Sequence, residues 1–341
     1  IISYDTALAL SKDAISFNNK GNALVGLRHF EEAIESYTQA IALDPSFNSY
    51  RNMGHTLMKA LRFEEAISAY DKALEWQADF VSFNNRGNAL VCVGRYVEAI
   101  SSFNLAIEHK PDFIPSYLNK GNTLLTLGRL KEAIAVYQEI VKLQPDAVYA
   151  YHHISNVAML LGDVDLAISA YRRITELQPD AFNAYNNLGN ALAASGRHAD
   201  AIMCYDKSIL LAPKESIHAY NGIGNSLFVL NKFEAAINSY NQAVALNPEL
   251  PDPYNGKGNA LLKLGRIGDA VDAYSKAIEL RPSGACYSSQ ADAFMVIGRY
   301  EEALFAYQHV INLQPNDFNV HNNMGQALAI LRRYEDAIIA Y

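Results

Sequence analysis

The sequence contains few cysteines, and they are scattered. Three of its 341 residues are cysteine, and Cys92, Cys204 and Cys286 share no spacing typical of a metal site or a disulfide framework. The nine histidines include no His-Glu-x-x-His motif. An odd number of separated thiols is typical of a reducing compartment. We therefore expect a cytoplasmic protein with no metal and no cofactor.

Long basic runs and long apolar runs are also missing. The longest basic runs are Arg172-Arg173 and Arg332-Arg333, and the formal net charge is −8. Nucleic-acid binders generally need a basic face, so this composition argues against a nucleic-acid partner. No apolar stretch reaches the roughly 18–20 residues that a membrane span requires. The first five residues contain no Lys or Arg of a signal peptide. We expect neither a nucleic-acid nor a membrane partner.

No arrangement of residues predicts an active site. The sequence offers no Ser-His-Asp or Cys-His constellation and no lysine-containing phosphate loop. The pairs Gly222-x-Gly224 and Gly256-x-Gly258 fall inside predicted helices, whereas a nucleotide-binding loop follows a strand. The chain is therefore predicted not to be an enzyme.

What the sequence does contain is a repeat. Half of the residues are hydrophobic, which is enough for a large core. A glycine recurs every 33–35 residues, with Ser155 and Ala291 in its place in two repeats. Twelve residues after this position an alanine follows in all ten repeats, and an aromatic residue stands four residues further. A proline follows the alanine by twelve residues in eight of nine repeats. Such a fixed period indicates a solenoid of stacked supersecondary units.

Each repeat reads as two amphipathic helices joined by a tight turn. In one repeat the apolar spacing predicts helices over about Val81–Val93 and Val97–Lys110, with Gly94 supplying the left-handed residue between them. Acidic pairs such as Glu31-Glu32 begin the second helices, where they complement the helix dipole. The proline ends the second helix. Glycine and alanine allow close helix contact, and the first-helix aromatics, such as Phe17, are expected to fill the adjoining space.

These columns resemble the tetratricopeptide repeat. One repeat carries Tyr185-x2-Leu188-Gly189-x2-Leu192, then Ala201-x3-Tyr205, then Pro213. The usual Trp is replaced by Tyr or Phe, and the usual second Tyr is mostly Leu. The resemblance implies an all-α, right-handed superhelical solenoid of antiparallel helix hairpins, whose first helices line the concave side.

The register predicts one solenoid over residues 1–341. A partial repeat is expected at 1–13 and a truncated repeat at 318–341, so the chain is expected to be a fragment of a longer protein. The complete repeats are expected at 14–46, 47–79, 80–113, 114–147, 148–181, 182–216, 217–250, 251–283 and 284–317.

Asparagine is unusually frequent in the middle of the first helices. It forms three columns, which we call the Asn18, Asn19 and Asn22 columns after their first members. Because Asn costs roughly 0.5–0.7 kcal/mol against Ala in a helix, its repetition needs a reason. One interpretation is that the amides bind the backbone of an extended guest peptide, as in the similar superhelical arms of O-GlcNAc transferases. The other is that they bond between stacked helices.

The sequence predicts a scaffold that binds an extended protein segment in its concave groove. Alternatives are the substrate-recognition arm of a larger enzyme, such as a protein glycosyltransferase, and a scaffold that self-associates through its uncapped ends as a homo-oligomer. A basic clamp for a carboxylate is not expected, because Arg86 and Lys120 lie in a more inward column. The predicted peptide-binding residues are Asn84, Asn88, Asn122, Asn186, Asn190, Asn221, Asn225 and Asn259.

Overall fold

The computed structural model describes residues 13–341, which form helices and short connections without a β-strand. The predicted partial repeat at 1–13 therefore lies almost entirely outside the described residues. The chain divides into two compact units, Ile1–Leu161 and Gly162–Tyr341, and each is described here by itself.

The helices of each unit follow one another with short connections. The first unit contains α2 (Ala14–Gly26), α3 (Phe30–Leu43), α4 (Phe47–Lys59), α5 (Phe63–Trp76), α6 (Phe80–Cys92), α7 (Tyr96–His109), α8 (Ile114–Thr126), α9 (Leu130–Leu143) and α10 (Val148–Leu161). The second unit contains α11 (Val164–Leu177), α12 (Phe182–Ala194), α13 (His198–Leu211), α14 (Ile217–Val229), α15 (Phe233–Leu246), α16 (Pro251–Lys263), α17 (Ile267–Leu280), α18 (Gly284–Val296), α19 (Tyr300–Leu313), α20 (Phe318–Ile330) and α21 (Tyr334–Ala340). The helices expected at Val81–Val93 and Val97–Lys110 begin and end about one residue earlier.

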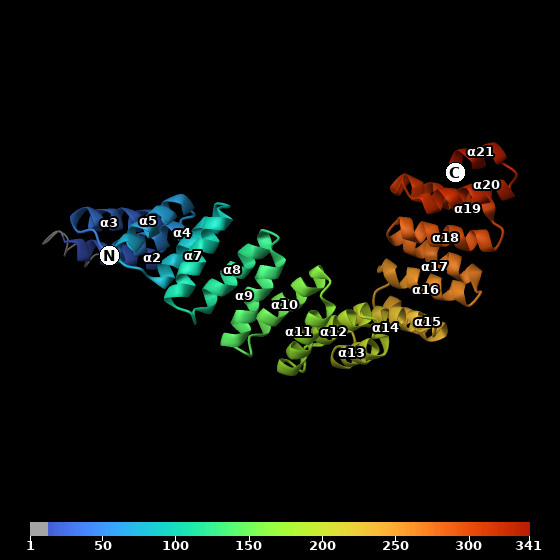
Figure 1. Cartoon of the computed structure of the whole chain (residues 1–341), viewed down its shortest axis with the longest axis horizontal. Helices are drawn as coiled ribbons and strands as arrows, with labels where there is room; N and C mark the ends of the chain where they lie inside the picture. The colour runs from blue at the N-terminus through green and yellow to red at the C-terminus, as the bar shows by residue number, and fades with distance from the viewer. Residues whose placement is uncertain (1–12) are drawn as a thin grey trace. The chain divides into compact units, whose positions relative to one another are not determined.

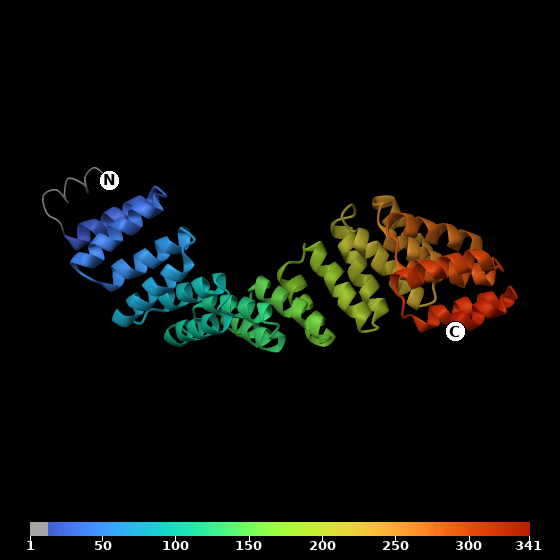
Figure 2. The same cartoon turned by 90° about the horizontal axis from the view of Figure 1, so that it is seen from above.

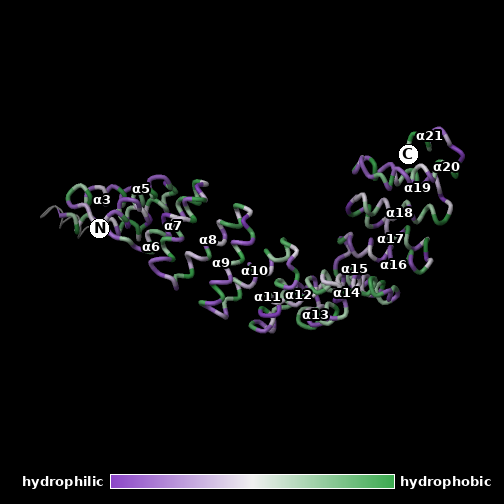
Figure 3. Tube along the Cα trace, viewed as in Figure 1, coloured by the Kyte–Doolittle hydropathy of each residue, from purple (hydrophilic) through white to green (hydrophobic). Residues whose placement is uncertain are grey.

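Within each unit, consecutive helices pack as antiparallel hairpins that stack in chain order. Examples are the pairs α2 with α3 and α12 with α13, and each second helix also packs on the first helix of the next hairpin. Figure 1 and the perpendicular view in Figure 2 both show this pairing. Hydrophobic and hydrophilic stretches alternate along the helices (Figure 3), as the amphipathic pattern predicted. The predicted all-α fold of helix hairpins is confirmed.

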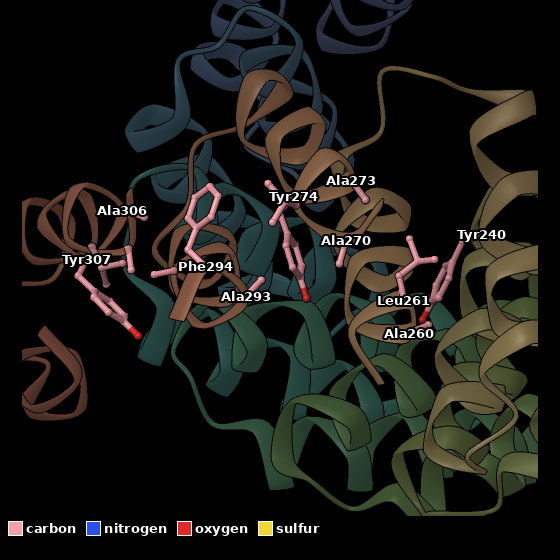
Figure 4. Close-up of a cluster of buried hydrophobic side chains, with 14 of the residues drawn as sticks. Tyr240, Ala260, Leu261, Ala270, Ala273, Tyr274, Ala293, Phe294, Ala306 and Tyr307 are labelled. Atoms are coloured by element: carbon pink, nitrogen blue, oxygen red, sulfur yellow. The ribbon is translucent and has the colours of Figure 1, made fainter. Parts of the chain in front are cut away.

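The core of each hairpin is built on small residues. The alanine column is buried in every repeat, from Ala33 to Ala337. The large rings beside it belong to the second helices: Tyr240, Tyr274 and Tyr307 lie in one such cluster (Figure 4) and are at most 1% exposed. The first-helix aromatics lie at the margin of this space: Phe17 is only partly buried, and Tyr287 is partly buried and packs against the cluster of Figure 4.

The turn inside each hairpin needs one left-handed residue, as predicted. Gly94 has a φ of +78°, and Asn231 one of 58°. Three repeats place another residue there, and Arg28, Leu61 and Arg332 adopt the same positive φ. Because a Cβ in this conformation crowds the following carbonyl at roughly 1–2 kcal/mol, these three turns hold backbone strain.

Acidic residues occupy the first turn of the second helices, which confirms the predicted placement. Arg62 stands at the N-cap of α5. Its guanidinium nitrogens lie 2.7 Å from a carboxylate oxygen of Glu65 in the same helix and 2.7 Å from one of Glu31 in the preceding hairpin. Arg95 repeats this arrangement with Glu98 and Glu64. These pairs are exposed, so each contributes about 0–1 kcal/mol at most. They link adjacent hairpins on the second-helix side.

Leu61→Gly should stabilise the first unit, because glycine relieves the positive φ and the Leu61 side chain is 72% exposed. We expect a gain of about 0.5–1 kcal/mol in the free energy of unfolding. The reciprocal change Gly94→Ala should cost about 1 kcal/mol. Denaturant unfolding followed by circular dichroism measures both. A loss of stability in Leu61→Gly would contradict the strain argument.

Candidate functional site

The eight predicted asparagines all lie on first helices, three in the first unit and five in the second. Asn84 and Asn88 lie on α6, and Asn122 lies on α8. The second-unit residues lie on three successive first helices, α12, α14 and α16: Asn186, Asn190, Asn221, Asn225 and Asn259.

The Asn22 column is hydrogen-bonded to the buried tyrosine of the same hairpin. The Tyr205 hydroxyl donates to Asn190 Oδ1 over 2.8 Å, and Tyr240 donates to Asn225 Oδ1 over 2.8 Å. Asn122 and Asn259 accept in the same way from Tyr137 and Tyr274, over 2.7 Å each. Because the oxygen faces the hydroxyl, each amide keeps its NH₂ group for other partners. This column therefore serves packing and presents donors.

Asn88 is the exception within this column. The second-helix ring of its hairpin is Phe103, which lies against Gly87 as the tyrosines lie against their glycines but has no hydroxyl group. The Asn88 oxygen therefore receives no bond of the kind that fixes Asn190 or Asn225.

Asn84 lies in the interface between successive first helices. It is 6% exposed, and its Oδ1 accepts from Ser116 Oγ over 3.1 Å and from Asn119 Nδ2 over 3.0 Å. Asn18 is used similarly, since Asn52 Nδ2 donates to its Oδ1 over 3.3 Å. In the first unit, members of the Asn19 column thus satisfy members of the Asn18 column. This corrects the expectation that Asn84 lines an open groove.

The second unit breaks this pattern. Gly222 and Gly256 stand where Asn52 and Asn119 stand in the first unit, so they offer no side-chain donor. The buried side-chain oxygens of Asn186 and Asn221, which face these positions of the next hairpin, have no hydrogen-bond partner. The buried oxygen of Asn255 has none either, although Ser289 stands at the corresponding position of its next hairpin. Asn255 is not among the eight predicted residues, although its place in the column could have identified it.

The Gly-x-Gly pairs are explained by three tyrosine rings, those of Tyr205, Tyr240 and Tyr274. A Cβ on Gly222 would lie 2.5 Å from the ring of Tyr205, and one on Gly189 would lie 2.6 Å from the same ring. Gly224 and Gly256 flank Tyr240 in the same manner, at 2.5 Å each. The rings of Tyr205 and Tyr240 are therefore each enclosed by glycines of their own and of the next first helix. Sequence reasoning placed these glycines inside helices but did not find this role.

Two neighbouring pockets open along these helices of the second unit. The larger has a volume of about 560 Å³ and the smaller about 400 Å³. They share Asn221, Asn225 and Val229. The larger also contains Asn186 and Asn190, and the smaller Asn255 and Asn259. The structure thus brings all five predicted second-unit asparagines, together with Asn255, to adjoining pockets.

Of the two residues considered for a carboxylate clamp, Arg86 is engaged elsewhere and Lys120 is partly buried. Arg86 pairs with Asp71 and donates to Ser102 Oγ. Burial lowers the pKa of Lys120. Among residues 13–341, no group of His, Cys, Asp and Glu side chains could hold a metal ion. None of the described helices combines the length and apolarity that a bilayer crossing requires.

The fold and its columns define a helix-hairpin repeat protein, and matches to family models identify the repeat family. A model described as TPR repeat matches residues 224–265 and 291–330. Models described as tetratricopeptide repeat match residues 14–47, 48–80, 114–147, 154–215 and 251–283. The chain belongs to the tetratricopeptide repeat family. This membership supports a protein-interaction scaffold as the general class of function.

Solved structures show the same fold. The C-terminal part of a TPR repeat-containing protein from Cytophaga hutchinsonii is 18% identical, covers 70% of this chain and 98% of its own, and has a TM-score of 0.60. A tetratricopeptide repeat protein from Parabacteroides merdae is 15% identical, with 73% and 98% covered and a TM-score of 0.55. The Cut9-Hcn1 structure is 12% identical, with 99% and 88% covered and a TM-score of 0.50. No curated protein matches the chain.

Gly222→Ala should destabilise the second unit, because the added methyl group would overlap the Tyr205 ring. We expect a loss of about 1–3 kcal/mol in the free energy of unfolding. Gly268→Ala in α17 is the matched control, since a Cβ there meets nothing within 4 Å. That change should stabilise by up to about 1 kcal/mol. Chemical unfolding monitored by circular dichroism compares them, and equal effects would contradict the ring contact.

Alkaline pH should destabilise the hairpins through their buried tyrosines. Burial raises the pKa of Tyr137 and Tyr205 to about 12. In the unfolded chain a tyrosine ionises near its ordinary pKa of about 10. The unfolded state therefore loses its protons first, and this stabilisation is complete below about pH 10 and lost as the pH rises toward about 12. Near-ultraviolet tyrosinate absorbance and circular dichroism should change together in this window; tyrosinate formation complete by pH 10 in the folded chain would contradict it.

Proposed function

We propose that this chain is a protein-interaction scaffold that binds an extended segment of a partner protein along the first helices of its second unit. The observation that supports it is a pair of asparagines on the first helix of each of three successive hairpins. One asparagine of each pair has an oxygen without a donor, and the other has an NH₂ group left for a partner. Asn186, Asn221 and Asn255 carry buried oxygens without a donor. Four residues further along each helix, an Asn22-column residue has its oxygen bonded to tyrosine and its NH₂ group left over.

This arrangement suits a polypeptide backbone. Residues four apart lie on one face of a helix, so the acceptor and the donor of each hairpin belong to the same helix face. An extended peptide carries one N–H donor and one C=O acceptor per residue, and both need partners when water is excluded. Amide side chains can therefore bind a guest without reading its side chains. The Asn torsion about Cβ–Cγ is broad, so a buried oxygen can turn toward a guest.

The proposal is centred on five of the predicted residues, those of the second unit. Asn84 is excluded from it because its oxygen is already used between α6 and α8. Asn122 bonds to Tyr137 as Asn190 bonds to Tyr205, so it can present only its NH₂ group. Asn88 has no such bond, and we give it no part in this proposal.

The test begins with the selection of binding peptides from a random peptide display library. Affinities of the selected peptides are then measured by fluorescence anisotropy. A variant with Asn186, Asn190, Asn221 and Asn225 all changed to Ala should bind at least about tenfold more weakly, since each lost hydrogen bond costs roughly 0.5–1.5 kcal/mol.

Asn104→Ala provides the control, because Asn104 is exposed on the second helix α7 in the other unit. It should leave the affinity unchanged. Circular dichroism and thermal unfolding show whether the fourfold variant keeps its fold. Undiminished binding by a folded fourfold variant would refute the proposed role of these amides.

A further inference from the structure

Two dipeptides of the second unit place a glycine directly after an asparagine. They are Asn221-Gly222 in α14 and Asn255-Gly256 in α16, and the sequence contains no other Asn-Gly pair. In both, the asparagine belongs to the Asn18 column, and glycine replaces the asparagine of the Asn19 column. A Cβ at either glycine would lie 2.5 Å from the second-helix tyrosine ring of the preceding hairpin. The packing of the second unit therefore requires an Asn-Gly pair at these two places.

Asn-Gly is the asparagine dipeptide that deamidates most readily. The glycine nitrogen loses its proton to solvent and attacks the side-chain Cγ of asparagine, so that an N–Cγ bond forms. The Cγ–NH₂ bond then breaks, and the NH₂ group takes up a proton and leaves as ammonia. Water opens the resulting succinimide ring at one of its two carbonyls and gives aspartate or isoaspartate. Glycine favours this attack because it has no Cβ and its backbone is the least restricted.

The folded helix keeps both pairs from reacting. In an α-helix each backbone nitrogen donates to the carbonyl four residues earlier, and ψ is fixed at about −42°. The nitrogens of Gly222 and Gly256 are therefore engaged, and they cannot turn toward the Cγ of the preceding asparagine. Gly222 is also buried, and Asn221 and Asn255 are partly buried. Ring closure thus requires the helix to open at these residues.

Both pairs lie where their helices open most easily. Asn221 and Asn255 are each the fifth residue of their helix. The N-cap residues Ser216 and Leu250 make no side-chain hydrogen bond to the first turn. Helix ends open at a lower free energy than the packed core, and loss of the first two turns frees the glycine nitrogen.

We propose that Asn221-Gly222 and Asn255-Gly256 are deamidation sites, and that the reaction proceeds from the locally opened helices α14 and α16. This inference does not depend on the proposed function. It assigns the second unit a covalent modification that the first unit lacks, since no Asn-Gly pair lies among residues 1–161.

The products prevent the opened helix from closing again. Isoaspartate adds one methylene group to the backbone, which shifts the helical hydrogen bonds out of register. Aspartate places a carboxylate where the buried asparagine oxygen has no donor. Burial of an unpaired charge is strongly unfavourable. Asn221 lines both pockets and Asn255 the smaller one, so either product also alters their lining.

The test is incubation of the full chain at neutral pH, both in native buffer and in concentrated urea. Peptide mass spectrometry measures the deamidation of each asparagine over time. In urea, both Asn-Gly pairs should react at least about tenfold faster than Asn186, which occupies the same column but is followed by Asn187. In native buffer, both pairs should react at least about tenfold more slowly than in urea, because only the open fraction reacts.

Hydrogen exchange of the same glycine amides tests the opening step. Exchange and deamidation both need the nitrogen of Gly222 or Gly256 freed from its helical bond. The factor by which the fold slows deamidation at each pair should therefore match the factor by which it slows exchange at that glycine, within about threefold. Deamidation much faster than this match would show that the closed helix reacts, and it would overturn the proposed route.

A glutamine variant tests the consequence for folding. Asn221→Gln combined with Asn255→Gln removes both pairs, because glutamine would have to close a larger and slower-forming ring. After prolonged incubation in urea and dilution, this variant should recover its helicity by circular dichroism. The unmodified chain should lose recovery in step with deamidation. Asn186→Gln combined with Asn190→Gln is the matched control, which keeps both Asn-Gly pairs and should behave like the unmodified chain.

The unmodified chain alone decides the sites, so the assignment stands even where a glutamine variant folds poorly. Absence of faster deamidation at the two Asn-Gly pairs in urea, or equal rates in urea and in native buffer, would overturn it. Equal loss of recovery in both glutamine variants would show that deamidation does not prevent refolding.

Discussion

The contact between a second-helix ring and a small first-helix residue, which is glycine in eight of the ten repeats, holds the hairpins together. The ring of Tyr205 would lie 2.6 Å from a Cβ at Gly189, so only glycine lets the two helices approach this closely. The alanine column is buried in every repeat, and its small side chains let the second helix pack equally closely against its other neighbours. Because such packing transmits any added volume to its neighbours, the columns of small residues are as strict as the columns of large ones.

The tyrosine hydroxyl joins this buried contact to a polar side chain of the first helix. It reaches the Asn22 column at 2.7–2.8 Å and fixes which edge of each amide faces outward. One buried ring therefore both fills the core and orients a polar group that a partner could meet. Phe103 shows the separation of these roles, since it packs against Gly87 as the tyrosines pack against their glycines but leaves Asn88 without a hydroxyl donor.

Both units are built from the same kind of hairpin, but their successive first helices contact one another differently. In the first unit, Asn119 on α8 closes the interface by donating to Asn84 on α6. In the second unit, Gly222 and Gly256 replace that donor, the tyrosine rings contact the next first helix, and asparagine oxygens remain unpaired beside two pockets. Natural proteins seldom leave buried polar groups unpaired without a reason. The replacement of an asparagine donor by Gly222 and Gly256 is why both proposals are placed in the second unit.

The sequence by itself determined the helix hairpin, because the spacing of Gly, Ala, aromatic and Pro residues is a local property of a 3.6-residue helix and its turns. It also identified the asparagine columns and the left-handed turn residues. It could not decide which asparagines are buried, since Asn84 and Asn186 occupy the same column and differ only in what the next hairpin places against them. Nor could it show that Arg28 and Leu61 adopt positive φ, or that Gly222 encloses a ring of the preceding hairpin. Only the tertiary structure decided these points, because the Gly222 and Asn84 contacts join neighbouring hairpins, 17 and 35 positions apart, and the pattern of a single repeat does not contain them.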